Sequence, residues 1–157
     1  MHSGWTLRRW LPRRRRHGRR PLGAARMWGA ALSRLEVADG LAWTVLPLSE
    51  QQTFGYEPQG DTGLPNVLVN IETVQMAAAF TEREDGKVEV GFRAVPGFDV
   101  AGIALALGGG GHKLASGCLL PGPLEQAERD VLALLRGELA RQREAAASDD
   151  GRHPQPG

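Results

Sequence analysis

Hydrophobic residues recur at steps of three and four along several stretches of the chain, the spacing that keeps apolar side chains on one face of a helix. Side chains that can cap a helix precede two of these stretches, namely Asp61 with Thr62 and, further along, Asp99. The pattern is clearest near the C-terminal end. The predicted helices are Leu22–Leu35, Leu64–Ile71, Val100–Leu107 and Pro123–Arg143.

Shorter stretches predict β-strands, because they are rich in strand-forming residues or alternate apolar and polar positions. In one of them, the alternation places the large apolar residues on one face and Lys87, Glu89, Gly91 and Arg93 on the other. Glu84–Gly86 predicts a hairpin turn before that strand. The predicted strands are Leu41–Leu46, Val74–Thr81, Lys87–Ala94 and Ser116–Leu120.

The order of these elements predicts the fold class. It runs helix, strand, helix, hairpin, helix, glycine-rich loop, strand, helix, with a further loop expected over residues 49–60. This order predicts a small α/β domain with a mixed β-sheet and helices packed on it. We expect the domain to span residues 21–143 and the termini, residues 1–20 and 144–157, to be disordered.

The charges are strongly segregated, although the net charge of the 157 residues is only +1. Residues 1–35 contain ten arginines and no acidic residue, whereas residues 36–157 carry about −9. A basic segment of this kind favours either an arm that binds RNA or directs targeting, or translation from an upstream start or a wrong frame. A DNA-binding protein with a basic tail is a further hypothesis, which depends on residues 1–20 alone.

Several classes of protein are excluded by composition. The single cysteine, Cys118, rules out an internal disulfide and a zinc site built from several thiolates, and we interpret it as a small buried apolar residue. No apolar run approaches the ~20 residues that a membrane-spanning helix needs. We therefore expect a cytoplasmic protein without a membrane partner.

Four consecutive glycines, Gly108–Gly111, followed by His112 are the most unusual feature of the sequence. Glycine loses more backbone entropy on folding than any other residue, so a run of four needs a physical reason. One hypothesis is an anion site, because consecutive backbone N–H groups without side chains can converge on a phosphate. The alternative is a flexible connector followed by an ordinary surface histidine. The spacing fits neither a Walker loop nor a dinucleotide-binding fingerprint.

The sequence FDVAGIALALGGGGHKLASGC around this run resembles the GGGH signature of the DHH-associated domain, the C-terminal module of DHH-family phosphoesterases. Upstream, GDTGLPNVLVNIETVQMAAAF and VEVGFRAVPGFDV resemble a helix and two strands of the same module. The resemblance covers roughly residues 22–143 and is nearest to the bacterial oligoribonuclease and pAp phosphatase branch.

The resemblance implies a phosphate-binding site and, in the whole enzyme, a separate metal centre. The phosphate and nucleotide would be held by Gly109, Gly110, Gly111 and His112 with the strand residue Arg93. A preceding DHH domain would hold two divalent metal ions, usually manganese, through Asp and His residues. Asn66 and Lys113 are further candidates, Asn66 as a contact to a base or ribose or as an ordinary surface residue.

The sequence departs from the family in one important respect, because it contains no Asp-His-His triplet. Metal-assisted hydrolysis needs clustered carboxylates and imidazoles, so we assign no catalytic residue, metal ligand or cofactor to this chain. We expect a module that binds a nucleotide or short-RNA phosphate and is inactive by itself, acting either alone or together with a DHH domain encoded separately. The alternative is an inactive remnant of a split or frameshifted gene.

Overall fold

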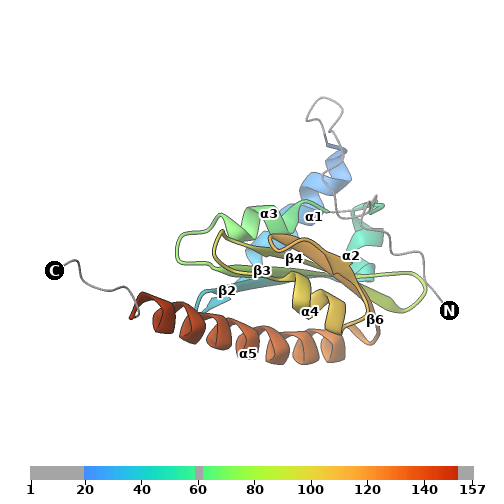
Figure 1. The fold of residues 1–157 in the computed structure, drawn as a ribbon. Coiled ribbons are helices and arrows are strands. Elements are labelled where there is room, and N and C mark those ends of the chain that lie inside the picture. Colours follow the sequence, from blue (N-terminus) through green and yellow to red (C-terminus); the bar gives the residue numbers. More distant parts are fainter. Residues whose placement is uncertain (1–19, 59–61, 152–157) are drawn as a thin grey trace.

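The computed structural model describes residues 20–58 and 62–151, and these form a mixed β-sheet between two layers of helices (Figure 1). The predicted basic segment 1–20 lies almost entirely outside the described residues. Within them, the helices are α1 (Leu22–Ser33), α2 (Leu48–Thr53), α3 (Leu64–Val69), α4 (Ala101–Ala106) and α5 (Leu124–Asp150). The strands are β1 (Glu36–Ala38), β2 (Leu41–Leu46), β3 (Met76–Glu82), β4 (Lys87–Ala94), β5 (Gly110–Gly111) and β6 (Ala115–Pro121).

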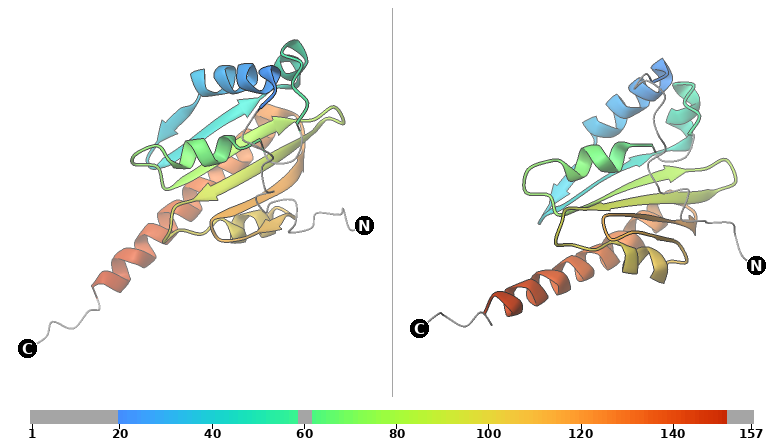
Figure 2. Two further views of the ribbon diagram at one scale, coloured as in Figure 1. Left: turned by 90° about the horizontal axis from the view of Figure 1, so that it is seen from above. Right: turned by 45° about the horizontal axis from the view of Figure 1, so that its top comes forward.

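The strand order across the sheet is β1-β2-β3-β4-β6-β5. Strands β2 and β3 run parallel, whereas each other neighbouring pair is antiparallel. Helices α1, α2 and α3 lie on one side of the sheet, and α4 and α5 lie on the other (Figures 1 and 2). The predicted α/β class with a mixed sheet is therefore confirmed.

The two faces of the sheet carry side chains of different size. Towards α4 and α5, the alternating residues of β4 and β6 are large and buried, and they pack against Val131, Leu135 and Leu139 of α5. Towards α1 and α3, the central strands carry small residues such as Ala77 and Ala79, which lets the helices approach closely. The buried residues of β4 and β6 on the first face include Val88, Val90, Phe92 and Cys118.

The structure corrects the prediction for the loop over residues 49–60, because α2 occupies its first part. This helix is only six residues long and depends on the buried side chain of Gln51, whose amide donates to the carbonyl oxygens of Leu46 and Glu82, both at 2.8 Å. A short helix that is fixed by polar contacts of one side chain to β2 and β3 has no apolar periodicity, so the sequence pattern does not reveal it.

Two further differences concern the ends of elements. Strand β1 is three residues long and exposed, too short for an alternation to be recognised. Helix α5 continues to Asp150, beyond the predicted end at Arg143, so residues 144–150 of the predicted tail are helical. The extension is exposed and begins with Glu144 and three alanines, residues that favour helix without packing. No helix among the described residues is long and apolar enough to cross a membrane.

The single cysteine is confirmed as a buried residue of β6, in the core between the sheet and α5. Burial raises the pKa of the Cys118 thiol to about 12, because the low-dielectric core disfavours the thiolate. Since the thiolate is the reactive form, the folded protein should resist alkylation.

We therefore expect iodoacetamide to leave Cys118 unmodified in the folded protein at about pH 8, where an exposed thiol of ordinary pKa is partly ionised. In concentrated urea the same thiol should be alkylated quickly. Mass spectrometry of samples quenched at intervals measures both rates. Equal rates in buffer and urea would show that the strand is accessible and would contradict the assigned core.

Candidate phosphate-binding site

Arg93 lies near the end of β4 and is only 6% exposed. It is on the α3 side of the sheet, where its Nε donates a 2.7 Å hydrogen bond to Oδ1 of Asn66 on α3. Its Nη1 donates to the Phe92 carbonyl oxygen at 2.8 Å. Burying a guanidinium is costly unless polar groups surround it. These contacts help to hold the buried cation in a defined orientation, whereas the strand pattern had placed Arg93 on a polar face.

The pairing of β4 with β6 brings Arg93 into line with His112. Arg93 is the register partner of Ala115, and Ala115 exchanges backbone hydrogen bonds with His112, at 2.8 and 3.2 Å. Adjacent strands are separated by about 4.8 Å, so the Cα atoms of Arg93 and His112 are about 10 Å apart. The structure thus brings together two predicted site residues that are 19 positions apart in the chain.

At three of the four positions in the run, the conformation or packing of the chain itself explains why the residue is glycine. Gly108 has a φ of 83° and ends α4 in the left-handed conformation that glycine adopts most easily. A Cβ at Gly109 would lie 2.0 Å from the Gly117 carbonyl oxygen, and one at Gly111 would lie 2.5 Å from the Ser116 Cα. The run therefore packs directly on the backbone of β6 and is more than a flexible connector.

Gly110 differs from its neighbours. A Cβ at this position would meet no atom within 4 Å, and its φ is not in the region that favours glycine. Its register partner Gly117 is also the partner of Gly91, so three glycines form a row across β5, β6 and β4. Because side chains alternate along a strand, this row is on the same face of the sheet as Arg93. Gly110 is at the end of this row, and the space beside its Cα is open.

Fewer backbone N–H groups of the glycine run can reach a ligand than the sequence predicted. The N–H groups of Gly108 and Gly109 donate to carbonyls of α4, and the His112 N–H donates to Ala115. Since His112 and Ala115 exchange both bonds, the next pair along the antiparallel ladder is a non-bonded one. The Gly111 N–H therefore faces the open edge of β5, so one backbone donor of the run is directed outwards.

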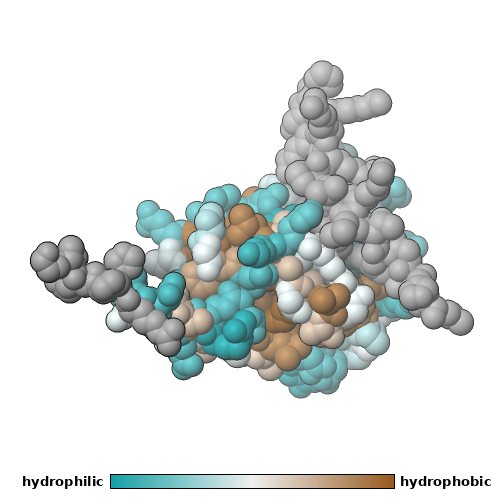
Figure 3. Space-filling model, in the orientation of Figure 1, coloured by the Kyte–Doolittle hydropathy of each residue, from teal (hydrophilic) through white to brown (hydrophobic). Residues whose placement is uncertain are grey.

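The turn that follows the glycine run is exposed, from His112 through Lys113 to Leu114. Leu114 is 43% exposed and Leu105 on α4, before the run, is 72% exposed. Figure 3 shows apolar surface over α4, with polar residues towards the C-terminal end of α5. His112 and Lys113 are thus placed where an approaching ligand can reach their side chains.

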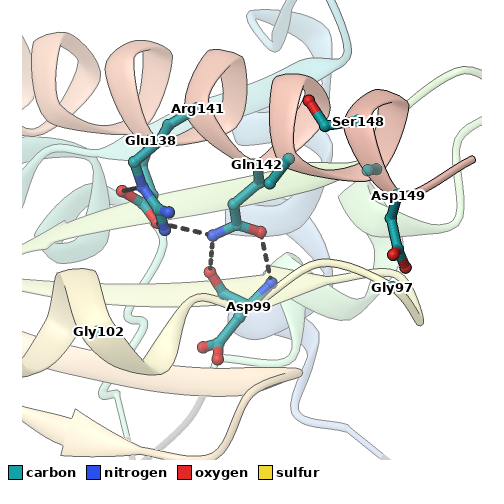
Figure 4. Close-up of a pocket in the computed structure, with 10 residues that line it drawn as sticks. Gly97, Asp99, Gly102, Glu138, Arg141, Gln142, Ser148 and Asp149 are labelled. Carbon is teal, nitrogen blue, oxygen red and sulfur yellow. Dashed lines mark hydrogen bonds and ion pairs between the residues drawn. The ribbon is translucent and has the colours of Figure 1, made fainter. Parts of the chain in front are cut away.

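A cleft of about 720 Å³ lies elsewhere, between the start of α4 and the C-terminal part of α5 (Figure 4). Gln142 is one of its lining residues, and its side-chain amide accepts from the Asp99 N–H at 2.9 Å and donates to the Asp99 carbonyl at 2.8 Å. Hydrogen bonds from Arg141 and Gln142 lower the pKa of Glu138. These groups hold α5 against α4, and none of the predicted site residues lines the cleft.

Asp99, predicted as the N-cap, lies one residue before the observed N-cap Val100, and its Oδ1 accepts from the Ala101 N–H at 2.7 Å. The described residues do not fit a manganese ion, because nowhere among them do three His, Cys, Asp or Glu side chains come together as ligands. No step of hydrolysis is therefore assigned to a metal ion held by these residues.

Comparison with known proteins identifies the family. Residues 51–141 match the DHHA1 domain, which is more than half of the chain, and the chain belongs to this family. It is 34% identical over 123 residues to the bifunctional oligoribonuclease and PAP phosphatase NrnA of Thermus thermophilus. That match covers 78% of this chain but only 37% of the relative, so the chain spans little more than a third of the relative's length.

Two solved structures share the fold. An exopolyphosphatase-related protein from Bacteroides fragilis superimposes with a TM-score of 0.70 at 23% identity, over 82% of this chain and 37% of the other. The pGpG-specific phosphodiesterase PggH from Vibrio cholerae gives a TM-score of 0.53 at 15% identity, over 74% of this chain and 39% of the other. At these identities, the likeness is one of fold.

The packing of the glycine run gives a direct test. We expect Gly109→Ala to lower the free energy of unfolding by about 1–3 kcal/mol, the usual cost of forcing extra volume into a packed region. Gly110→Ala, the matched control, should change it by less than about 0.5 kcal/mol, as for an open surface position. Urea denaturation of the three proteins measures both values. Equal destabilisation by the two variants would show that the run does not pack on β6 as described.

Proposed function

We propose that this DHHA1 domain binds the phosphate of a nucleotide or short RNA. In this proposal it serves as the substrate-binding part of a DHH-family phosphoesterase whose metal ions are held by a DHH domain outside these 157 residues. Arg93 and His112 supply side-chain donors, and Gly110 and Gly111 supply bare backbone at the edge of the sheet, while Gly109 packs on β6. Lys113 adds a positive charge near the same turn.

The observation that carries the proposal is the alignment of Arg93 with His112 beside an open glycine. A buried, oriented guanidinium suits a phosphate, because its planar fork matches two phosphate oxygens. The absence of a side chain at Gly110 is explained neither by a clash nor by the backbone conformation. Close approach of a ligand to the backbone gives that absence a reason.

The relatives support a nucleotide as the ligand. The names of the Thermus thermophilus and Vibrio cholerae proteins describe activities on oligoribonucleotides, PAP and pGpG, all of which contain phosphate joined to nucleosides. We extend this ligand class to the present chain. We expect weak binding of a mononucleotide by these residues alone, with a dissociation constant on the order of millimolar, or ~4 kcal/mol. Salt should weaken it, because the ligand is a dianion.

Titration of the isotopically labelled chain with AMP, followed by NMR, tests the proposal. We expect shifts centred on the amides of Gly110–His112 and on the Arg93 side chain. His112→Ala should weaken binding several-fold, and Arg93→Lys should weaken it about tenfold, because lysine keeps the charge but loses the fork. Lys87→Ala, which removes a charge at the far end of the same strand, is the matched control and should bind as the wild type does.

Adenosine provides the ligand control, because it lacks the phosphate. The proposal requires adenosine to leave Gly110–His112 largely unshifted at concentrations where AMP shifts them. Shifts spread over the arginines of residues 1–20, with none at the glycine run, would contradict the proposal. They would show that the nucleotide is attracted only to a basic segment.

A further inference from the structure

Asn66 makes the contact that links α3 to the buried Arg93. It lies in the first half of α3 and is exposed, yet its side chain reaches across to a strand residue 27 positions later in the chain. The acceptor is the amide oxygen, 2.7 Å from the Arg93 Nε. Because Nε–H is a donor only, the oxygen of the amide has to face it. The orientation of the Asn66 amide is therefore fixed by chemistry.

That orientation leaves the amide nitrogen pointing elsewhere. An NH₂ group carries two donors, and on a planar amide it lies beside the oxygen, next to the guanidinium. No hydrogen bond among the described residues engages the Asn66 NH₂, whereas the Asn66 backbone carbonyl accepts from the Asn70 side chain at 2.7 Å. The two N–H donors of the exposed Asn66 side chain therefore lie beside the oriented guanidinium of Arg93.

The neutrality of the Asn66 side chain also affects the net charge beside Arg93. A carboxylate in the place of Asn66 would orient Arg93 equally well, but it would add a negative charge where a phosphate has to approach. The amide orients the guanidinium without adding any charge of its own. At the same time it presents hydrogen-bond donors, the groups that a phosphate or a ribose hydroxyl oxygen accepts from.

We infer that Asn66 belongs to the ligand site in two roles, as the positioning residue for Arg93 and as a donor to the phosphate-bearing end of the nucleotide. This inference depends on the proposed function, because it assigns a further residue to the same site. It predicts that the two roles respond differently to substitution.

Two substitutions separate the roles, and AMP is the probe. Asn66→Ala removes both the acceptor and the donor, and we expect it to weaken AMP binding roughly two- to tenfold, the factor that one ordinary hydrogen bond supplies. Asn66→Asp has almost the same shape and keeps an acceptor for Arg93, but it replaces the NH₂ with a charged oxygen. We expect Asn66→Asp to weaken AMP binding at least as much as Asn66→Ala.

Asn70 provides the matched controls. It is exposed and follows one turn after Asn66, at the end of α3, so Asn70→Ala and Asn70→Asp repeat the same chemical changes away from Arg93. Both control variants should bind AMP within about twofold of the wild type, because the Asn70 side chain donates to the Asn66 backbone carbonyl and not to Arg93 or to the Asn66 side chain. Their melting temperatures report any general effect on the helix.

A second readout follows the positioning role directly. The Nε–H of Arg93 gives an NMR signal that can be assigned by its loss in Arg93→Lys. This signal should move in Asn66→Ala without ligand, because its acceptor is gone, and it should stay in place in the Asn70 variants. Unlike a melting temperature, the signal reports the contact itself.

The outcomes that overturn the inference are distinct from failure of the proposed function. If wild-type protein binds AMP and Asn66→Ala or Asn66→Asp binds it equally well, Asn66 is not part of the site. Equal weakening by Asn66→Asp and Asn70→Asp would show a general effect of charge and would also overturn it. If the wild type shows no AMP-dependent shift at Gly110–His112, the proposed function itself fails.

Discussion

Two backbones approach so closely where the glycine run crosses β6 that no side chain fits between them. A Cβ at Gly109 or Gly111 would lie less than 3 Å from backbone atoms of β6. This close approach converts the connection after α4 into the edge strand β5 and the turn from His112 to Ala115. Because β6 also pairs with β4, the same contact brings His112 into the row of Arg93. The geometry of the candidate site depends on this one constraint.

The two faces of the sheet have different roles: the face towards α5 forms the core, and the face towards α3 carries the candidate ligand-binding residues. Large residues such as Phe92 and Val90 fill the space between the sheet and α5. The face towards α3 carries small residues, and the polar side chains of Arg93 and Asn66 meet there. The cleft beside α5 is on the supporting side, where Gln142 joins two elements through hydrogen bonds. None of the predicted site residues lines this cleft, which makes it a poorer candidate for the ligand than the edge of β5.

The sequence predicted those parts of the fold that depend on local pattern. Strand β4 was predicted with the bounds that the structure has, because its alternation is regular, and the position of Asp99 placed the start of α4 to within one residue of the observed N-cap Val100. Helix α2 was missed, because Gln51 fixes it through contacts to β2 and β3 that no local pattern contains.

The candidate site could be named from the sequence only as a set of residues. The glycine run and its resemblance to the GGGH signature pointed to the region, but the sequence does not show which glycines pack on β6 and which one opens to solvent. The alignment of Arg93 with His112 follows from the pairing of β4 with β6, and the role of Asn66 from the packing of α3. Both are long-range contacts, so the sequence left Asn66 between two interpretations.

Gly110→Val tests most directly whether the open glycine is reserved for a ligand. Valine suits a strand, and its side chain would occupy the space that is empty in the protein, so the fold should keep its stability. Gly102→Ala, at an exposed position of α4 with equally open surroundings, is the control. The account predicts that AMP binding, measured by NMR titration, is lost in Gly110→Val and retained in Gly102→Ala. Wild-type AMP affinity in a folded Gly110→Val protein would contradict it.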